Sequence, residues 1–335
     1  MRDRLVVFAC TLGFAVCLGL SLSETRLAAE GIEKGTRGSR QAPIPRTDDA
    51  AAPSYLGQIR PGLVPRVFAP GQISLPGRYE HDICFSKDGR ECYFTVRNAG
   101  WTVHRIMVTR YENGRWTQPV KASFSDDASL CPSLADDDQS LYFSRSGDVW
   151  KALRSPTGSG TNQGWFPPKP VPAPVSSRQG EWSCHISSLG NLWFCSWRPG
   201  GLGKCDLWRA ARSATGLFTE AINLRGLNTS DSDCYPVPGP KEDYFIWSSD
   251  RKGGFGNTDL YISFADGQGG WTAPKNLGPA INTSGHEAGP YLSPDHKYLF
   301  FCRCDTSKGD SEDIYWVRVE AFLPDPNKPV SKGRD

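Results

Sequence analysis

Short apolar and aromatic runs recur between residues 80 and 316, and each run is bounded by turns rich in Gly, Pro, Asn or Asp. Apolar and polar positions alternate within the runs, which is typical of strands that bury one face. Gly and Pro interrupt the chain too often for helices of ordinary length. The pattern therefore predicts an all-β chain.

The runs form one unit that occurs five times. Each unit has an anchor, the last aromatic residue of its central strand, and successive anchors are 49, 51, 53 and 54 residues apart. The anchors are Phe94, Phe143, Phe194, Trp247 and Phe301. Repeat periods of roughly 20 to 50 residues are typical of solenoids and propellers. We therefore expect one repeat domain, at residues 65–322.

Each unit can be divided into four strands. No fourth strand follows Tyr315 in the last unit, whereas 67–73, just before the first unit, alternates suitably and can supply it. Such pairing would leave no open sheet edge. We therefore expect a β-propeller of five four-stranded blades, closed by an N-terminal strand. The strands of one unit are typified by 287–292, 298–302 and 313–317, and the fourth by 271–277 in the unit before.

Several segments between residues 65 and 320 follow a common repeat signature. They are FSKDGRECYF, SSDRKGGFGNTDLYIS, WTAPKNLGPAINTS, LSPDHKYLFF and EDIYWV. In these segments the chain resembles the WD40-like β-propeller repeats of the TolB-type superfamily, which is found in exported bacterial proteins. It departs from the pattern at 187–190 and 238–241, where the Pro-Asp-Gly turn is lost. The resemblance implies a binding scaffold, because its motifs build blades and define no activity.

The N-terminus reads as a targeting segment. Arg2 and Arg4 precede an apolar run at 5–22, and small residues precede Glu24, so residues 1–23 are expected to direct export. An uncleaved anchor is the alternative, because the apolar run approaches the length that spans a bilayer. The chain would then be periplasmic or extracellular, and membrane-tethered if the segment is retained.

Composition defines the remaining segments and excludes one class of partner. Residues 24–64 are polar, with Gly, Pro and scattered charge, which predicts a flexible linker rather than a degenerate sixth blade. Residues 323–335 are expected to form a C-terminal tail. A net charge of +2 gives no electrostatic footprint for nucleic acid.

The cysteines suggest a disulfide but no zinc ribbon. Eleven cysteines less the two in the signal segment leave nine, so at least one thiol is unpaired within the chain. Cys84 and Cys92 flank a predicted hairpin turn and are the best disulfide candidates. The alternative is that both are small buried apolar residues. The chain contains no CxxC pair.

Acidic residues recur at the start of the first strand of each unit. Because the first strands of a propeller line its axis, we expect these carboxylates to meet at one mouth, where a polar ligand or a calcium ion would suit them. The alternative is that each acid accepts backbone N–H bonds from the neighbouring blade, because a residue repeated in every blade more often serves the blade. The column consists of Glu80, Ser129, Glu181, Asp233 and Glu287, and the neighbouring polar candidates are His81, Asp82, His185 and His286.

Two further sets of residues complete the prediction. Arg198 with Asp206 and Arg251 with Asp259 are each eight apart, and we expect each pair to join the ends of a Gly-rich loop. Three tryptophans lie outside the repeated columns and are candidates for stacking on sugars or gripping peptide side chains, with packing between blades as the alternative. They are Trp101, Trp182 and Trp197.

These observations favour an exported, non-catalytic propeller that binds a protein or glycan at its axial face. The alternative is a carbohydrate-active hydrolase or lyase, because glycoside hydrolysis needs two carboxylates about 5 to 9.5 Å apart. Its candidate catalytic residues would be Glu80, Glu181, Asp233 and Glu287. No serine-hydrolase or HExxH motif is present, and no metal is assigned with certainty.

Overall fold

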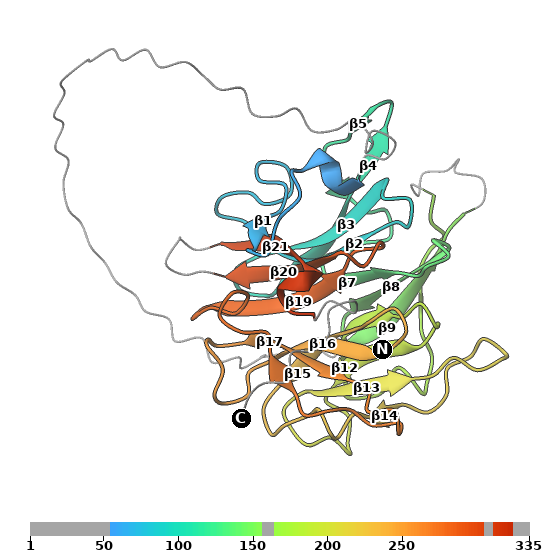
Figure 1. Ribbon diagram of the computed structural model, residues 1–335. Helices are drawn as coiled ribbons and strands as arrows, with labels where there is room; N and C mark the ends of the chain where they lie inside the picture. Colours follow the sequence, from blue (N-terminus) through green and yellow to red (C-terminus); the bar gives the residue numbers. More distant parts are fainter. Residues whose placement is uncertain (1–53, 156–163, 305–310, 324–335) are drawn as a thin grey trace, which may run out of the picture. The chain divides into compact units, whose positions relative to one another are not determined.

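The computed structural model describes residues 54–155, 164–304 and 311–323 (Figure 1). All of them belong to one compact unit, Asp48–Asp335. The signal segment, the C-terminal tail from residue 324 and most of the expected linker lie outside the described residues. Within the described part of the chain, no helix has the length and apolar character needed to cross a membrane.

The strands form units of four in chain order. The first unit has β2 (Tyr79–Phe85), β3 (Glu91–Arg97), β4 (His104–Glu112) and β6 (Val120–Lys121), with β5 (Arg115–Trp116) paired to the end of β4. The second has β7 (Ser129–Leu134), β8 (Ser140–Arg145), β9 (Asp148–Leu153) and β10 (Lys169–Pro170). The third has β11 (Glu181–Ile186), β12 (Leu192–Ser196), β13 (Asp206–Ala210) and β14 (Ile222–Asn223).

The fourth unit has β15 (Asp233–Pro238), β16 (Tyr244–Ser249), β17 (Asp259–Phe264) and β18 (Lys275–Asn276). The last has β19 (His286–Leu292), β20 (Tyr298–Cys304) and β21 (Glu312–Arg318), with β1 (Arg66–Val67) beside β21. Two short 3₁₀ helices, η2 (Ser54–Gly57) and η4 (Val319–Ala321), flank the strands. Successive strands of a unit are antiparallel, so the predicted all-β propeller is confirmed, and the number of blades stays a prediction.

The anchors form the core of the units. All five anchor side chains are fully buried, which explains why an aromatic residue recurs at this position. Each anchor lies on the second strand of its unit, between two paired strands. The regular spacing of the anchors in the sequence therefore reflects a buried core that occurs once in every unit.

The first strands of the units, β2, β7, β11, β15 and β19, contact one another in turn, and we call them the inner strands. The acidic residue at the start of three inner strands donates its backbone N–H to the preceding unit. Such bonds join Glu181 to Gly147 at 2.7 Å, Asp233 to Cys205 at 2.8 Å and Glu287 to Thr258 at 2.9 Å. The last and first units meet in a related way, because Tyr79 of β2 pairs in parallel with Glu312 of β21.

The segment before the first unit pairs with the last unit over a shorter stretch than expected. Arg66 and Val67 are antiparallel to β21, and the backbone N–H of Phe68 donates to Ile314 at 2.7 Å. The chain then turns at Ala69, which has a left-handed backbone, so residues 69–73 form no strand. Phe68 is nevertheless fully buried, and the segment caps the core of the last unit.

Part of the expected linker belongs to the folded domain. Tyr55 and Leu56 of η2 are only 5% and 6% exposed. The Tyr55 ring contacts aromatic residues of both the first and the last units, and its hydroxyl donates to Asp295 at 2.7 Å. The ordered structure thus begins before residue 65, because one aromatic residue beyond the repeats is needed to cover the core.

The disulfide expected between Cys84 and Cys92 is absent. Both thiols are free and fully buried. Cys84 lies opposite Tyr93, and Cys92 lies opposite Phe85, so the two cysteines occupy diagonal positions in the hairpin. They pack as small apolar residues, which was the alternative interpretation.

Tyr55 provides a test of how the N-terminal segment contributes to stability. Replacing a buried aromatic side chain by alanine typically costs about 3 to 5 kcal/mol, so Tyr55→Ala should lower the free energy of unfolding by that order. Tyr55→Phe keeps the ring and loses one hydrogen bond, which should cost about 1 kcal/mol. Denaturant unfolding of both variants measures the difference. Equal stability of Tyr55→Ala and the unchanged protein would contradict the packing role.

Candidate functional site

Each inner strand contains a β-bulge two residues after its acidic position. The residue at the bulge has a left-handed backbone, with φ between 31° and 56°. For residues other than glycine this conformation costs about 1 to 3 kcal/mol, and it is concentrated at functional sites. Bulges also re-aim side chains. We call these five the bulge residues: Asp82, Cys131, Ser183, Tyr235 and Gly289.

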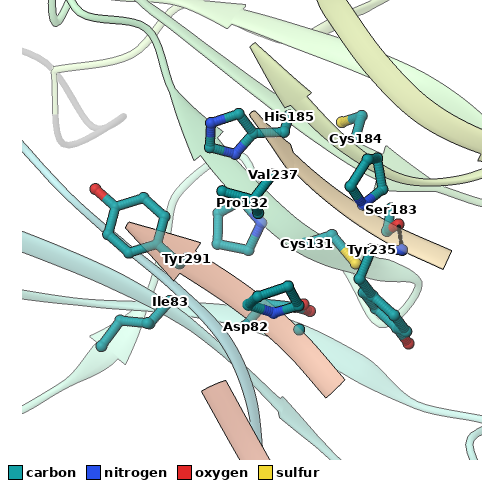
Figure 2. A pocket seen from close by; sticks show the side chains of 13 residues that line it. Asp82, Ile83, Cys131, Pro132, Ser183, Cys184, His185, Tyr235, Val237 and Tyr291 are labelled. Carbon is teal, nitrogen blue, oxygen red and sulfur yellow. Dashed lines mark hydrogen bonds between the residues drawn. The ribbon is translucent and has the colours of Figure 1, made fainter. Parts of the chain in front are cut away.

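The bulges bring backbone groups of neighbouring units together. The backbone N–H of Cys131 donates to the Thr95 hydroxyl at 3.2 Å. The backbone N–H of Tyr235 donates to the Ser183 hydroxyl at 3.0 Å, as Figure 2 shows. A bulge leaves its backbone donor without a partner in the ladder, and a hydroxyl from the next unit supplies one. At the Cys131 and Tyr235 bulges a hydrogen bond between units thus offsets part of the strain.

All five bulge residues line one small cavity between the inner strands. Its volume is about 30 Å³, which is room for about two water molecules or an ion. Figure 2 shows Cys131, Ser183 and Tyr235 together on one side, with His185 and Tyr291 on the other. His185 and Tyr291 also line a second cavity of about 70 Å³ near the turns that follow the inner strands.

The predicted carboxylates lie elsewhere. None of the four lines either cavity, and all are fully buried. Glu181 accepts hydrogen bonds from the Ser177 backbone N–H at 2.8 Å and the Ser177 hydroxyl at 2.5 Å, and it pairs with Arg198 at 2.8 Å. The other two of this kind are Asp233, with Thr229 and Arg251, and Glu287, with Thr283 and Arg303.

The arginines complete the same arrangement in these three units. Arg251 donates to the carbonyl oxygen of Leu227 at 2.8 Å and lies over the Trp247 anchor ring at 5.3 Å. Arg303 does the same with Ile281 and Phe301. Each of these acids thus positions an arginine. The arginine packs on the anchor ring and bonds to the connection from the preceding unit. Glu80, Glu181, Asp233 and Glu287 therefore do not form the expected common site, because each is occupied within its own unit.

The expected pairing across the Gly-rich loops was wrong for the same reason. Arg198 and Arg251 turn to the acids of the inner strands rather than to Asp206 and Asp259. Asp206 instead accepts the backbone N–H groups of Leu202 and Gly203, and Asp259 accepts the equivalent groups of its own loop. The aspartates therefore hold the loops without a counter-ion.

The first unit departs from this pattern. Arg97 does not pair with Glu80, which is paired with Arg78 instead. Arg97 pairs with Glu312 of the last unit at 2.7 Å, and its guanidinium lies over the rings of Tyr79 at 4.4 Å and Trp101 at 3.8 Å. The change of partner brings a buried ion pair to the junction between the last and first units.

His81 joins this ion pair to a bulge residue. Its Nδ1 lies 2.9 Å from Asp82 Oδ1, and its Nε2 lies 3.8 Å from Glu312 Oε1. We call His81, Asp82, Arg97 and Glu312 the polar cluster; all four are buried. Burial opposes protonation of His81, but the charges of Asp82 and Glu312 outweigh it and raise the pKa of His81. Neither ring nitrogen, nor Glu312 Oε1, has a well-formed hydrogen bond.

Three further histidines have lowered pKa values, which favours their neutral form. Burial lowers the pKa of His104, His185 and His286 to about 4 in each case. Of the predicted histidines, His286 lies near the charges of His81 and Glu312, whereas His185 lies on the cavity wall away from them. The structure thus brings His81, Asp82 and His286 into one region and leaves His185 apart.

The three predicted tryptophans do come together. Trp101 contacts His81 and His104, His104 contacts Trp182, and Trp182 contacts Trp197, with ring centroids 5.5 to 6.3 Å apart. The Trp182 indole N–H donates to the Tyr235 hydroxyl at 3.3 Å. Trp101, Trp182 and Trp197 are all half-buried. We call Trp101, His104, Trp182, Trp197 and Tyr235 the aromatic patch; it borders the polar cluster through His81.

Two groups of three side chains in the described residues are arranged as metal ligands. One is Cys195, Cys205 and Cys234, and the other is His81, Cys302 and Glu312; in each, the ligand atoms lie within 4.8 Å of one another. Neither group contains the acids on which the calcium expectation rested. The Arg97 guanidinium already neutralises Glu312, which opposes cation binding by the second group.

Comparisons with known proteins add a likeness in fold. No protein-family model matches the chain, and no curated protein matches it. Among solved structures, TolB from Acinetobacter baumannii is similar over 72% of this chain and 55% of its own, with 12% identity and a TM-score of 0.43. The chain therefore spans about half the length of that TolB.

Two glycoside-cleaving enzymes are similar to a comparable degree. A thermostable family-43 glycoside hydrolase has 12% identity and a TM-score of 0.48, with 71% of this chain and 89% of its own covered. The α-L-arabinofuranosidase from Podospora anserina has 10% identity and a TM-score of 0.47, with 76% and 97% covered. The chain is a β-propeller similar in fold to TolB-type proteins, as its repeat segments predict.

The acid–arginine pairs generate a stability prediction. Removing one partner of a buried ion pair typically costs about 3 to 5 kcal/mol, so Glu181→Gln and Glu287→Gln should each destabilise the protein by that order. Denaturant unfolding measures the change, with Asp127→Asn at the exposed Arg105 pair as a control that should behave like the unchanged protein. Calorimetry with calcium should give no binding heat. Calcium binding that is abolished when Glu181→Gln and Glu287→Gln are combined would refute the architectural role.

Gly289 generates a prediction about the polar cluster. A Cβ at Gly289 would lie 2.9 Å from Asp82 Oδ1 and 3.0 Å from His81 Cε1, whereas one at Gly278 would meet nothing within 4 Å. Both glycines have positive φ, so backbone strain is common to the two alanine variants. Gly289→Ala should be less stable than Gly278→Ala by about 1 to 3 kcal/mol.

The same variant should change the titration of His81. The pKa of His81 is raised by Asp82 and Glu312, so separating His81 from Asp82 should move it down towards about 6.5. Protonation of His81 stabilises the fold below that pH, and this contribution is lost as pH rises through the higher folded-state pKa. NMR titration of the His81 imidazole follows both effects. An unchanged His81 titration in Gly289→Ala would contradict the crowding.

Proposed function

We propose that the chain is an exported, non-catalytic binding protein whose ligand docks on the aromatic patch, beside the polar cluster. The observation that carries the proposal is the gathering of residues that depart from the repeat. Repeated residues hold each unit together, whereas a side chain present in one unit only has no such role. His81, Trp101 and Trp182 are of this second kind, and they are neighbours. Arg97 beside them occurs in the other units as an arginine but has a different partner here, Glu312.

The chemistry of the patch favours a saccharide. Tryptophan rings offer flat apolar faces for stacking, and the Tyr235 hydroxyl and the His81 region add polar groups that fix orientation. The cavity that Tyr235 of the patch lines holds only about 30 Å³, so a sugar ring would lie outside it, on the patch. An extended glycan laid across the half-buried Trp101, Trp182 and Trp197 fits this geometry.

A hydrolase is the less favoured alternative. Glycoside hydrolysis needs one carboxylate as acid and a second as base or nucleophile, both open to the substrate. The four predicted candidates are buried and engaged by arginines or hydroxyl groups. Burial raises the pKa of Glu80 to about 7 despite Arg78, which would suit an acid, but Glu80 lines neither cavity. A second open carboxylate beside it would be needed.

Export is proposed from the sequence alone. The charged, apolar and small-residue order of residues 1–23 supports it, although that segment lies outside the described residues. A periplasmic or extracellular location would expose the aromatic patch to glycans of the cell surface. Retention of the segment would tether the domain through residues 24–53.

Substitution of Trp182 tests the proposed function. The purified protein is screened against immobilised glycans, and a bound oligosaccharide is then titrated by calorimetry. Trp182→Ala should weaken binding by about 30-fold, since truncation of a central aromatic anchor costs about 2 kcal/mol. Trp116→Ala, a half-buried tryptophan outside the patch, should bind like the unchanged protein.

Two results would count against the proposal. Equal losses in the two tryptophan variants would remove the patch from the binding site. Release of reducing sugar that Glu181→Gln or Glu80→Gln abolishes, with the fold retained, would favour the hydrolase.

A further inference from the structure

Three cysteine side chains converge from separate parts of the chain. Cys195 lies on β12, Cys205 immediately precedes β13, and Cys234 lies on β15. Their sulfur atoms all lie within 4.8 Å of one another, and all three thiols are free. No other Cys, His, Asp or Glu of the described residues completes this group. Neither the acid–arginine pairs nor the aromatic patch uses these thiols.

The spacing of the sulfur atoms suits a metal ion. A metal held by three sulfurs at about 2.3 Å in a plane places those sulfurs about 4.0 Å apart. Two sulfurs of a disulfide would have to approach to about 2.05 Å. The observed arrangement thus needs only small side-chain movements to hold an ion.

The surroundings allow the thiol protons to leave. The Cys195 thiol donates to the carbonyl oxygen of Trp182 at 3.1 Å. The Ser183 hydroxyl lies 3.4 Å from Cys195 Sγ and itself accepts the Tyr235 backbone N–H at 3.0 Å. When a metal replaces the protons, the Ser183 hydroxyl remains as a donor that stabilises the thiolate. The protons pass to solvent.

Access and charge are consistent with occupation. Cys195 and Cys205 are buried, but Cys234 is half-buried, which gives the ion a route to the group. Three thiolates around a monovalent ion would leave two negative charges, and a proton kept by one thiol would reduce them to one. Partial exposure of Cys234 makes that residual charge less costly.

The ligand set selects the ion. Thiolates are soft ligands, which bind Cu(I) or Zn²⁺ in preference to hard ions such as calcium. Structural zinc almost always has four protein ligands, and this group has three. We propose that Cys195, Cys205 and Cys234 bind one Cu(I) ion in trigonal coordination. The proposal is independent of the glycan-binding function.

The test uses the full chain, reduced and kept free of oxygen. Cu(I) is titrated against a chromophoric Cu(I) chelator, and X-ray absorption counts the sulfur neighbours of the metal. One Cu(I) with three sulfur neighbours is expected. Loss of outer-shell groups alone costs about 10- to 100-fold in metal affinity, so Cys195→Ala and Cys234→Ala should each weaken binding by at least about 100-fold. Cys92→Ala, a buried thiol elsewhere, should bind normally.

Alkylation of the unchanged protein provides a measurement that needs no variant to fold. Bound Cu(I) should protect Cys195, Cys205 and Cys234 from alkylation. The protein is unfolded briefly in the presence of the alkylating agent, and mass spectrometry then identifies the cysteines that were not modified. Unchanged affinity in both ligand variants would overturn the proposal. Binding of Zn²⁺ by a protein that does not bind Cu(I) would also overturn it. The same holds if two of the three cysteines form a disulfide and the protein still binds no Cu(I) after that disulfide is reduced.

Discussion

A buried acidic side chain at the start of the inner strand determines the geometry of its unit. In three units the acid accepts bonds from a Ser or Thr four residues earlier and holds an arginine over the anchor ring. A buried ion pair contributes little net stability compared with apolar residues of similar size, yet removal of one partner is costly. Its value here is positional, because it links the inner strand, the anchor and the connection from the preceding unit.

The exceptions to this arrangement lie together. In the second unit Ser129 stands in the acidic column, and Asp126 supplies the charge for Arg145 at 3.0 Å. In the first unit Arg78 serves Glu80, which leaves Arg97 available to Glu312. At this junction the two ring nitrogens of His81 and Glu312 Oε1 are buried without well-formed hydrogen bonds. The repeated arrangement is thus interrupted at the junction between the last and first units, next to half-buried tryptophans. The residues that could bind a ligand therefore lie together at this junction.

The sequence was sufficient for the fold because anchors, turns and alternation all repeat. It was also sufficient for the three tryptophans, which are conspicuous outside the repeated columns. It misplaced the acids, since a column of carboxylates does not show which arginine each one meets. It gave no signal for Cys131, Ser183 and Tyr235 at the bulges, where only Gly289 suggests a positive φ. The three-thiol group was equally hidden, because its members are 10 and 29 residues apart and meet only through packing.

The polar cluster also couples the candidate site to the junction between the first and last units. His81 and Arg97 belong to the first unit and Glu312 to the last, and Tyr79 pairs with Glu312 at the same point. If the last unit separated from the first, Arg97 and Glu312 would each lose a counter-ion in a buried setting, which is costly. Tyr55 and Phe68 cover the same junction with aromatic contacts. The residues that hold the first and last units together are therefore those that support the aromatic patch, so binding there should depend on an intact junction.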